Sequence, residues 1–447
     1  MTVELIKDPT PYADAFRDLM SKANREEPFW LTQQREAAFE YFKRSGFPTV
    51  HEEDWKYTNV APIARAKFTP ISDSTIAANR LNGNARAFFY DETRGSRLVF
   101  LNGVFQQHLS AVDSLPNGVV IGDFAEVLRR PDSGARVRKH LSQDNDDNAF
   151  VALNMALFSS AAFVLIPRAV EITSPIHLLF ISQAQNGNAP ASFPRVLVIA
   201  EENSSATIVE NYVGIGDGAY FTNTVVNLIV ESGARVQHYK VQRESGSAFH
   251  VAATNSTIGR GSRYDATTIN LGAALSRHNI AVAFNDEGGE CLVDGLYMIG
   301  ATQHSDTHSV IDHRRPHCTS HQLYKGVLDG KSHAVFNGKV FVRHGAQQTD
   351  AQQTNKNLLL SDEARVDTKP QLEIFADDVK CAHGAAVGQL DANELFYLES
   401  RGINPGLARN LLTYGFAEEV IQKINVPSLK RELDTAVLNR LGTEIDS

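Results

Sequence analysis

The spacing of hydrophobic positions changes twice along this chain. Up to about residue 60, apolar residues recur at intervals of three and four, which predicts helices over residues 12–24 and 31–45. An apolar run at residues 97–101 predicts a short strand, and the Asn102-Gly103 turn after it predicts a second strand. A short helix is expected at residues 149–159.

From about residue 161 to residue 388, helical spacing gives way to short runs rich in β-branched residues, such as PRVLVIA, TVVNLIV, ARVQHYKV and KVFVRH. Gly, Asn, Asp and Ser turns separate these runs. Four segments resemble one another and begin at equal intervals, at Ser204, Ser232, Arg260 and Gly288. A fifth, HCTSHQLY from His317, repeats the Cys…Leu-Tyr spacing that begins at Cys291, slightly less than one interval later.

A fixed interval of a few tens of residues is the signature of a solenoid. Each repeat has strands and turns but no helix, so the pattern predicts the stacked coils of a parallel β-helix. In such a fold the inward Val, Ile and Leu residues bury one another, and the polar outward face is free to carry function. The period drifts after residue 324, which indicates inserted loops or an imperfect repeat.

Residues 390–447 return to helical spacing. Asp391 is placed to cap a helix over residues 392–401, and Asn404-Pro405 is placed to begin a second one. Gly415 is expected to end that second helix, and further helices are expected on either side of Pro427. A helical tail here would cap the open edge of the last coil and offer an apolar face to a partner.

These patterns predict a mainly β protein with a parallel β-helix core between an N-terminal mixed or helical domain and a C-terminal helical domain. The expected domains are residues 1–148, 149–388 and 389–447. A chain of 447 residues is too long for one ordinary compact domain, which agrees with this division.

Composition narrows the class of function. A net charge of −9 argues against a nucleic-acid binder with a broad basic surface. No apolar run approaches the ~20 residues that cross a bilayer, and the N-terminus shows no signal-peptide pattern. Three widely spaced cysteines make no disulfide framework, so we expect a protein of a reducing compartment, the cytoplasm, without membrane contact.

The stretch VKCAHGAAVG contains the strongest candidate site. If it is a strand, Cys381 and His383 point the same way and lie roughly 6–7 Å apart. A tetrahedral metal site wants four ligands, so this pair predicts a half-site that another chain completes. The simpler alternative is a buried cysteine next to a surface histidine.

Histidines cluster in the same part of the chain. Eight of the 15 fall between residues 304 and 383: His304, His308, His313, His317, His321, His333, His344 and His383. If all lie in strands, His304 and His308 share a face, and so do His313 and His317. A metal or cluster site is one interpretation, and stacking of like residues on the polar outer face of a β-helix is the other.

The glutamines and asparagines that lie among the last of these histidines suggest a structural role. They are Gln347, Gln348, Gln352, Gln353, Asn355 and Asn357, and they predict ladders of side-chain amides at a coil corner. The chain has no GxxxxGK[ST] phosphate loop, no GxGxxG after a strand and no GxSxG elbow. It also has no CxxC pair, so it cannot hold an iron–sulfur cluster with four cysteines.

The stretch NGKVFVRHGAQQTDAQQTNKNLLLSDEARVDTKPQLEIFADDVKCAHGAAVGQLDANELFYLESRGI resembles the C-terminal signature of the SufB/SufD family of the SUF iron–sulfur cluster assembly system. GFPTVHEEDWKYTNVAPI is similar to an N-terminal segment of the same family. The segment CAHGAAVGQLDANELFYLESRGI resembles the SufD branch, and the small number of cysteines agrees with that branch.

The resemblance implies a right-handed parallel β-helix between helical terminal domains. It implies a non-enzymatic scaffold that pairs with a SufB-like subunit and docks a SufC-like ATPase, with a possible homodimer in isolation. Cys381 and His383 match the junction where the nascent cluster is built, so the cluster is transient and not held tightly by the isolated chain. The ATPase-docking segment matches residues 395–424, with Tyr397, Leu398, Arg401, Gly402 and Ile403 at its core.

Two other functions remain open at this point. A β-helix can carry a carbohydrate-active enzyme that uses Asp, Arg and His residues on its outer face. The chain can also be a purely structural partner that makes no metal contact, in which case the other subunit holds every ligand.

Overall fold

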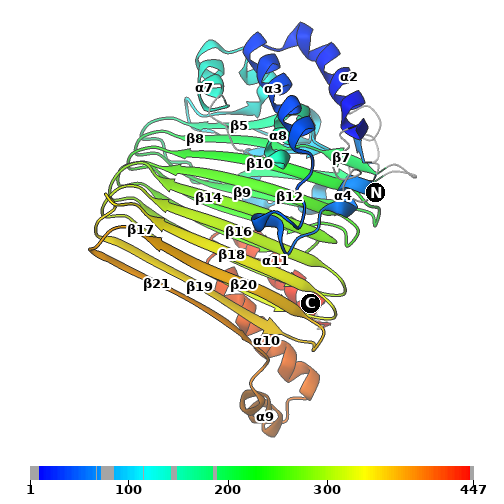
Figure 1. Cartoon of the computed structure of the whole chain (residues 1–447), viewed down its shortest axis with the longest axis vertical. Helices are drawn as coiled ribbons and strands as arrows, with labels where there is room; N and C mark the ends of the chain where they lie inside the picture. Colours follow the sequence, from blue (N-terminus) through cyan, green and yellow to red (C-terminus); the bar gives the residue numbers. More distant parts are fainter. Residues whose placement is uncertain are drawn as a thin grey trace.

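The fold is a parallel β-helix with helices at both ends, as Figure 1 shows. The structure is a computed structural model, and it describes residues 10–66, 68–71, 85–113, 115–141, 148–184 and 189–442. Each coil contributes one strand to each of two facing sheets, which we call sheet A and sheet B. The predicted fold class is therefore confirmed.

Sheet A has eleven described strands. In spatial order they are β4 (Val120–Asp123), β5 (Ala161–Ile166), β8 (Arg195–Ala200), β10 (Phe221–Val230), β12 (Phe249–Ile258), β14 (Leu275–Phe284), β16 (His304–His313), β18 (His333–Val342) and β20 (Arg365–Ile374). Off this path, β7 (Pro190–Ser192) pairs with β10, and β1 (Thr69–Pro70) pairs with β7.

Sheet B has ten described strands. In spatial order they are β3 (Val104–Phe105), β2 (Arg97–Leu101), β6 (Ile176–Gln183), β9 (Ser205–Ile215), β11 (Arg235–Arg243), β13 (Arg263–Asn270), β15 (Glu290–Ile299), β17 (Thr319–Leu328), β19 (Thr349–Leu359) and β21 (Val379–Gly388). The predicted pair β2 and β3 is confirmed, and β2 and β4 extend the two sheets from the part of the chain before residue 148.

The strand registers refine the repeat that the sequence predicts. Arg235 pairs with Arg263 at the expected interval, but the steps from Ser205 to Arg235 and from Cys291 to Ser320 are slightly longer. The sequence match had aligned Cys291 with Cys318, which lies two positions before the true partner Ser320. A shift of two positions leaves each side chain on its own face, so the period was recognisable although the alignment was wrong.

The interior of the β-helix is apolar on one side and polar on the other. Sheet A strands end in buried apolar residues such as Val230, Ile258 and Phe284, and they begin with buried polar ones such as Thr222 and His250. Stacked coils bury these side chains against equivalent positions above and below. Hydrophobic burial therefore holds one half of the coil, and hydrogen bonds organise the other half.

The N-terminal helices pack on the outer face of sheet A. They are α2 (Thr10–Glu26), α3 (Phe29–Ser45), α4 (Ala61–Arg65), α6 (Phe124–Val127), α7 (Pro131–Leu141) and α8 (Ala149–Leu157), with the 3-10 turn η1 (Glu53–Trp55). The 3-10 turns η2 (Ala85–Phe88), η3 (Asp91–Thr93) and η4 (Gln107–Leu109) lie instead beside sheet B. Their aromatic core includes Phe42, Phe47 and Phe150, which lie against strand residues such as Phe221. The helices predicted near residues 12–24, 31–45 and 149–159 are confirmed.

The C-terminal helices are α9 (Ala392–Ser400), α10 (Pro405–Ile421) and α11 (Pro427–Arg440). The last two cover part of the outer face of sheet B, so the helical tail does not cap the open edge of the last coil as expected. Leu429 and Leu433 of α11 are buried in one apolar cluster with Tyr239 and Val241 of β11. No helix in the described residues is long and apolar enough to cross a membrane.

The expected break at Gly415 is wrong, because α10 continues through it to Ile421. Glycine inside a helix costs only about 1 kcal/mol relative to alanine. The burial of Ala417, Val420 and Ile421 after Gly415 offsets that cost. The expected caps are confirmed: Asp391 accepts hydrogen bonds from the backbone N–H groups of residues 393 and 394, and Asn404 accepts one from residue 407.

Candidate site at the C-terminal end of the β-helix

Strand β21 lies at the end of sheet B, and it pairs with β19 on one side only among the described strands. The two strands are parallel and in register, with Ala351 beside Cys381 and Gln353 beside His383. Ala351 and Gln353 are buried and face the interior of the β-helix. Because paired residues point to the same side of a sheet, Cys381 and His383 also face the interior side. The two candidate donors therefore share one face at the open end of the solenoid.

Exposure differs between the two donors. Cys381 is half-buried and packs against the main core, whereas His383 is exposed. Burial raises the pKa of the Cys381 thiol, and a hydrogen bond from the backbone of Ala351 partly opposes that shift. A metal ion would therefore have to displace the thiol proton when it binds.

The end of the β-helix around these donors is apolar and uncovered by the described residues. Val366 and Leu372 of β20 are only partly buried against the core, while Ile374 is 40% exposed and Val387 of β21 is 47% exposed. In the preceding coils the equivalent positions, such as Val342, are buried by the next coil. This end therefore exposes interior surface that a further layer would cover.

A row of buried side-chain amides lies directly beneath β21. Gln353 donates to Gln322 at 2.7 Å, and Asn357 donates to Asn355 at 2.7 Å. These side chains point into the interior of the β-helix, so the expected amide ladder exists, but it lies inside the coil and not at a corner. Gln352, next to Gln353 in sequence, is exposed on the outer face.

The histidines do not gather into one site. In the described residues, no three His, Cys, Asp or Glu side chains are arranged to hold a metal ion. His304 and His308 share the outer face of β16, as predicted. His313 and His317 do not share a face, because His313 is buried in β16 while His317 lies in the following turn with φ of 60°. Positive φ takes that residue out of the strand alternation.

The segment around α9 stands away from the body of the molecule (Figure 1). None of the residues of α9 is buried, and Phe396 and Tyr397 are 71% and 56% exposed. The Arg401 guanidinium lies 5.0 Å from the ring centre of Tyr397. Gly402 has φ of 86°, and its neighbour Ile403 donates to the carbonyl of Leu398 at 3.3 Å. The five residues matched to ATPase docking thus lie together at the end of one exposed helix.

A second cluster of buried polar side chains, which the sequence pattern did not predict, lies inside the coils formed by β9 to β12. Glu210 and His238 are hydrogen-bonded, Lys240 Nζ lies 2.9 Å from His250 Nε2, and His250 Nδ1 lies 2.8 Å from Glu244. Burial lowers the pKa of Lys240 to about 8. Alternating polar residues in ARVQHYKV carried this signal, but they are equally typical of an outer face. The group lies several coils away from β21.

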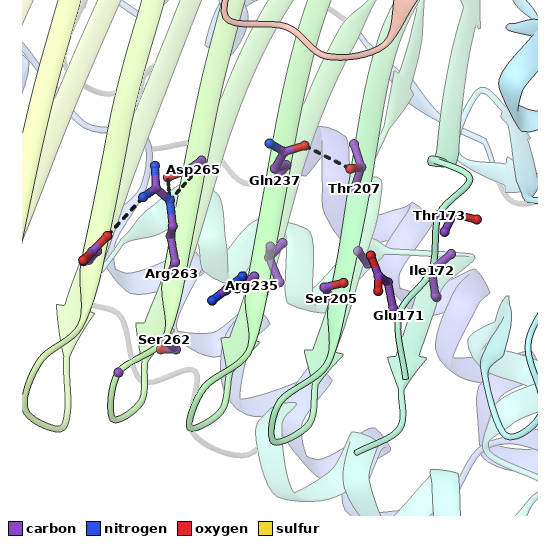
Figure 2. Close-up of a pocket in the computed structure, with 14 residues that line it drawn as sticks. Glu171, Ile172, Thr173, Ser205, Thr207, Arg235, Gln237, Ser262, Arg263 and Asp265 are labelled. Carbon is purple, nitrogen blue, oxygen red and sulfur yellow. Dashed lines mark hydrogen bonds and ion pairs between the residues drawn. The ribbon is translucent and has the colours of Figure 1, made fainter. Parts of the chain in front are cut away.

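A hollow of about 810 Å³ lies on the outer face of sheet B (Figure 2). Thr207 donates to Gln237 at 3.2 Å, and the Arg263 guanidinium binds Asp265 at 2.9 Å and Glu290 at 3.1 Å. This is where a carbohydrate-active β-helix enzyme would carry its carboxylates. Arg263 pairs with two of the carboxylates that line the hollow, Asp265 and Glu290, so these two form a surface ion-pair network and not a free acid–base pair.

Comparison with known proteins agrees with the motifs at both ends of the chain. The family model for the SufBD core domain of the SUF iron–sulfur cluster assembly system matches residues 180–416, and the model for the SufBD N-terminal region matches residues 7–178. Together the two matches span the N-terminal helices, the β-helix and most of α10.

Three relatives align along most of their length. An iron–sulfur cluster assembly SufBD family protein of Synechocystis is 37% identical over 91% of this chain and 90% of the relative. The iron–sulfur cluster assembly protein SufD of Escherichia coli is 33% identical over 90% of each chain. SufD of Bacillus subtilis is 27% identical over 92% of this chain and 94% of the relative. The chain therefore belongs to the SufBD family, and it has a role in iron–sulfur cluster assembly by the SUF system.

Proposed function

We propose that this chain is a non-catalytic scaffold subunit that pairs, through the open end of its β-helix, with a SufB-like subunit. The growing iron–sulfur cluster is the cargo of the complex and not a resident cofactor of this chain. The observation that carries the proposal is the position of Cys381 and His383, a thiol and an imidazole on one face at an uncovered solenoid end.

The shape and chemistry of that end favour a protein partner. A solenoid end exposes interior apolar surface and unpaired strand edges, and both need a cover. Ile374 and Val387 supply the exposed apolar surface, and β20 and β21 supply the edges. A second β-helix end would extend both sheets and bury this surface. A second copy of this chain could cover the same end when the SufB-like subunit is absent.

The donor set suits iron in part. Cys381 can supply a thiolate and His383 a neutral imidazole nitrogen, and both are common ligands of iron–sulfur centres. Two donors leave the remaining positions to the partner and to inorganic sulfide. The half-site of this chain therefore makes cluster building depend on a closed junction.

We further propose that the exposed end of α9 docks a SufC-like ATPase. Tyr397, Leu398, Arg401, Gly402 and Ile403 lie together at the C-terminal end of a helix that contributes no buried residue to the described core. Aromatic and arginine side chains are the residue types that most often anchor protein interfaces.

The test is the double variant Cys381→Ala, His383→Ala in the complex with both partners. We expect the subunits to co-purify as before, because these side chains are not central to the core of the chain. Cluster formation, followed by visible absorbance and by bound iron and sulfide, should fall severalfold or more. The matched control is Lys380→Ala with Ala382→Ser, which changes the exposed outer face of the same strand.

The outcome separates this proposal from a purely structural role. If the double variant assembles and builds clusters at the normal rate, the partner holds all the ligands and the half-site is wrong. If the complex fails to assemble, iron-edge spectroscopy of the single variants decides whether either side chain contacts iron.

A further inference from the structure

Gln353 has a role that rests on the proposed function of His383. Gln353 is 1% exposed and is the residue of β19 that pairs with His383 of β21. Adjacent strands are about 4.8 Å apart, so the two side chains stack on the interior face. Gln353 thus lies directly beneath the histidine that we place at the junction.

The amide orientation of Gln353 follows from its hydrogen bonds. Its Nε2 donates to Gln322 Oε1 at 2.7 Å, and Gln322 Nε2 in turn donates to Ser309 Oγ at 2.9 Å. Gly338 on the facing sheet makes room for the amide, because an added Cβ there would collide with Gln353 Nε2. The NH₂ group of Gln353 therefore points into the interior of the β-helix and donates its hydrogen bond there.

The amide oxygen of Gln353 takes no part in these hydrogen bonds. Gln353 Oε1 is buried, and it has no hydrogen-bond partner among the described residues. A buried carbonyl oxygen can only accept, and buried acceptors are nearly always paired. The ring of His383, one strand spacing away, offers one N–H in its neutral form.

We propose that Gln353 is a positioning residue whose Oε1 accepts the ring N–H of His383. This hydrogen bond holds the imidazole in one tautomer and directs the lone pair of the other ring nitrogen toward the junction. Metal-binding histidines are commonly oriented in this way by an acceptor on their second nitrogen. The row of hydrogen-bonded amides thus links the interior of the β-helix to the exposed imidazole of His383.

The test uses ¹⁵N-histidine-labelled full-length chain at a pH where the ring is neutral, and His383→Ala identifies the resonances of His383. In the unaltered protein, the two ring nitrogens should show the widely separated shifts of a single tautomer. Gln353→Met keeps the length of the side chain but removes the acceptor, so the shifts should move toward the average of two tautomers.

The matched control is Gln352→Met, because Gln352 is exposed on the opposite face of the same strand. It should leave the His383 resonances unchanged. If Gln353→Met also leaves them unchanged, or if Gln352→Met shifts them equally, the inference is wrong. Should Gln353→Met fail to fold, the unaltered protein still decides, because averaged ring-nitrogen shifts of His383 there overturn the hydrogen bond.

Cluster formation in the complex separates this inference from the proposed function. We expect Gln353→Met to slow cluster formation severalfold, and to add nothing when His383→Ala is already present. If Gln353→Met changes the His383 tautomer but His383→Ala does not slow cluster formation, the hydrogen bond stands and the proposed function is rejected. Cluster formation that needs His383, with a tautomer insensitive to Gln353, would reject only the positioning role.

Discussion

Arg277 and Asp306 form an ion pair that the N-terminal segment buries against sheet A. The Arg277 guanidinium lies 2.6 Å from Asp306, and Trp55 covers it with its ring centre 4.2 Å away. Arg277 also donates to the carbonyl of Asp54 at 2.7 Å, and Thr58 donates to the Asp306 carboxylate. Two side chains from the β-helix thereby fix a segment that is distant in sequence.

We predict that Asp306→Asn destabilises the chain by about 3–5 kcal/mol, because it leaves a buried guanidinium without its counter-charge. The free energy of unfolding from urea titration at neutral pH measures the effect. Asp217→Asn is the control, since Asp217 is exposed in the loop between β9 and β10 and should change stability by less than about 0.5 kcal/mol.

The same pair predicts a dependence on pH. Burial alone would raise the pKa of Asp306, but Arg277 and then His308 hold that pKa well below its usual range. A depressed carboxyl pKa gives stability that is present above the unfolded-state value of about 4 and is lost as the pH falls toward the folded value. The stability difference between the unaltered chain and Asp306→Asn should therefore shrink between about pH 5 and pH 3. A difference that stays constant over this range would contradict the role of the pair.

At the scale of single elements, α9 and α11 differ in how far their side chains are buried. Leu429, Leu433 and Val437 of α11 are fully buried against sheet B, whereas no residue of α9 is buried. Burial explains why α11 belongs to the stable body of the protein. Propensity and its Asp391 cap alone support α9, so its exposed side chains are available to a partner.

We predict that Phe396→Ala with Tyr397→Ala leaves the free energy of unfolding within about 0.5 kcal/mol of the unaltered value. Binding of the SufC-like ATPase should weaken at least about tenfold, because aromatic anchors at interfaces are commonly worth about 2 kcal/mol or more. Calorimetric titration of the ATPase into the full chain measures this. Glu399→Ala, exposed on the same helix, is the control. Unchanged ATPase affinity in the double variant would remove α9 from the docking surface.

The elements show how far a sequence pattern can reach. Alternation of side chains and a nearly constant period were enough to identify a β-helix, because these properties survive register errors of two positions. The continuation of α10 through Gly415 could not be predicted, since the burial of Val420 and Ile421 against a distant sheet decides it. Local signals were right for caps and turns, and tertiary packing overrode them inside α10.

The candidate site shows the same limit. The spacing of Cys381 and His383 was sufficient to place them on one face, because it depends only on strand geometry. The position of Gln353 beneath His383 depends on the register between β19 and β21, and the drifting period could not supply it. The amides Gln353 and Asn355 were expected at a corner, because polar residues in a β-rich sequence normally mark the outer face.

At the scale of the whole molecule, the two ends of the β-helix are finished differently. Near the N-terminal end, β4 pairs antiparallel with β5 and α6 packs beside them, whereas β20 and β21 end their sheets with exposed apolar residues. Solenoids need a cap at each end to remain soluble and folded. This difference supports the proposal that another chain covers the open end, and the proposal predicts where a single charge should block assembly.

We predict that Ala385→Lys prevents pairing with the SufB-like subunit while the chain stays folded. Ala385 is exposed on the interior-facing side of β21, next to buried Asn355 of β19, so a lysine there adds a charge to the surface that the partner must bury. Burying an unpaired ammonium costs several kcal/mol, so association measured by analytical ultracentrifugation should weaken far more than tenfold. Ala382→Lys adds the same charge to the outer face of the same strand and should weaken association much less. If Ala385→Lys pairs as tightly as the unaltered chain, the partner does not cover the end of the β-helix. The partner then cannot complete the half-site at Cys381 and His383.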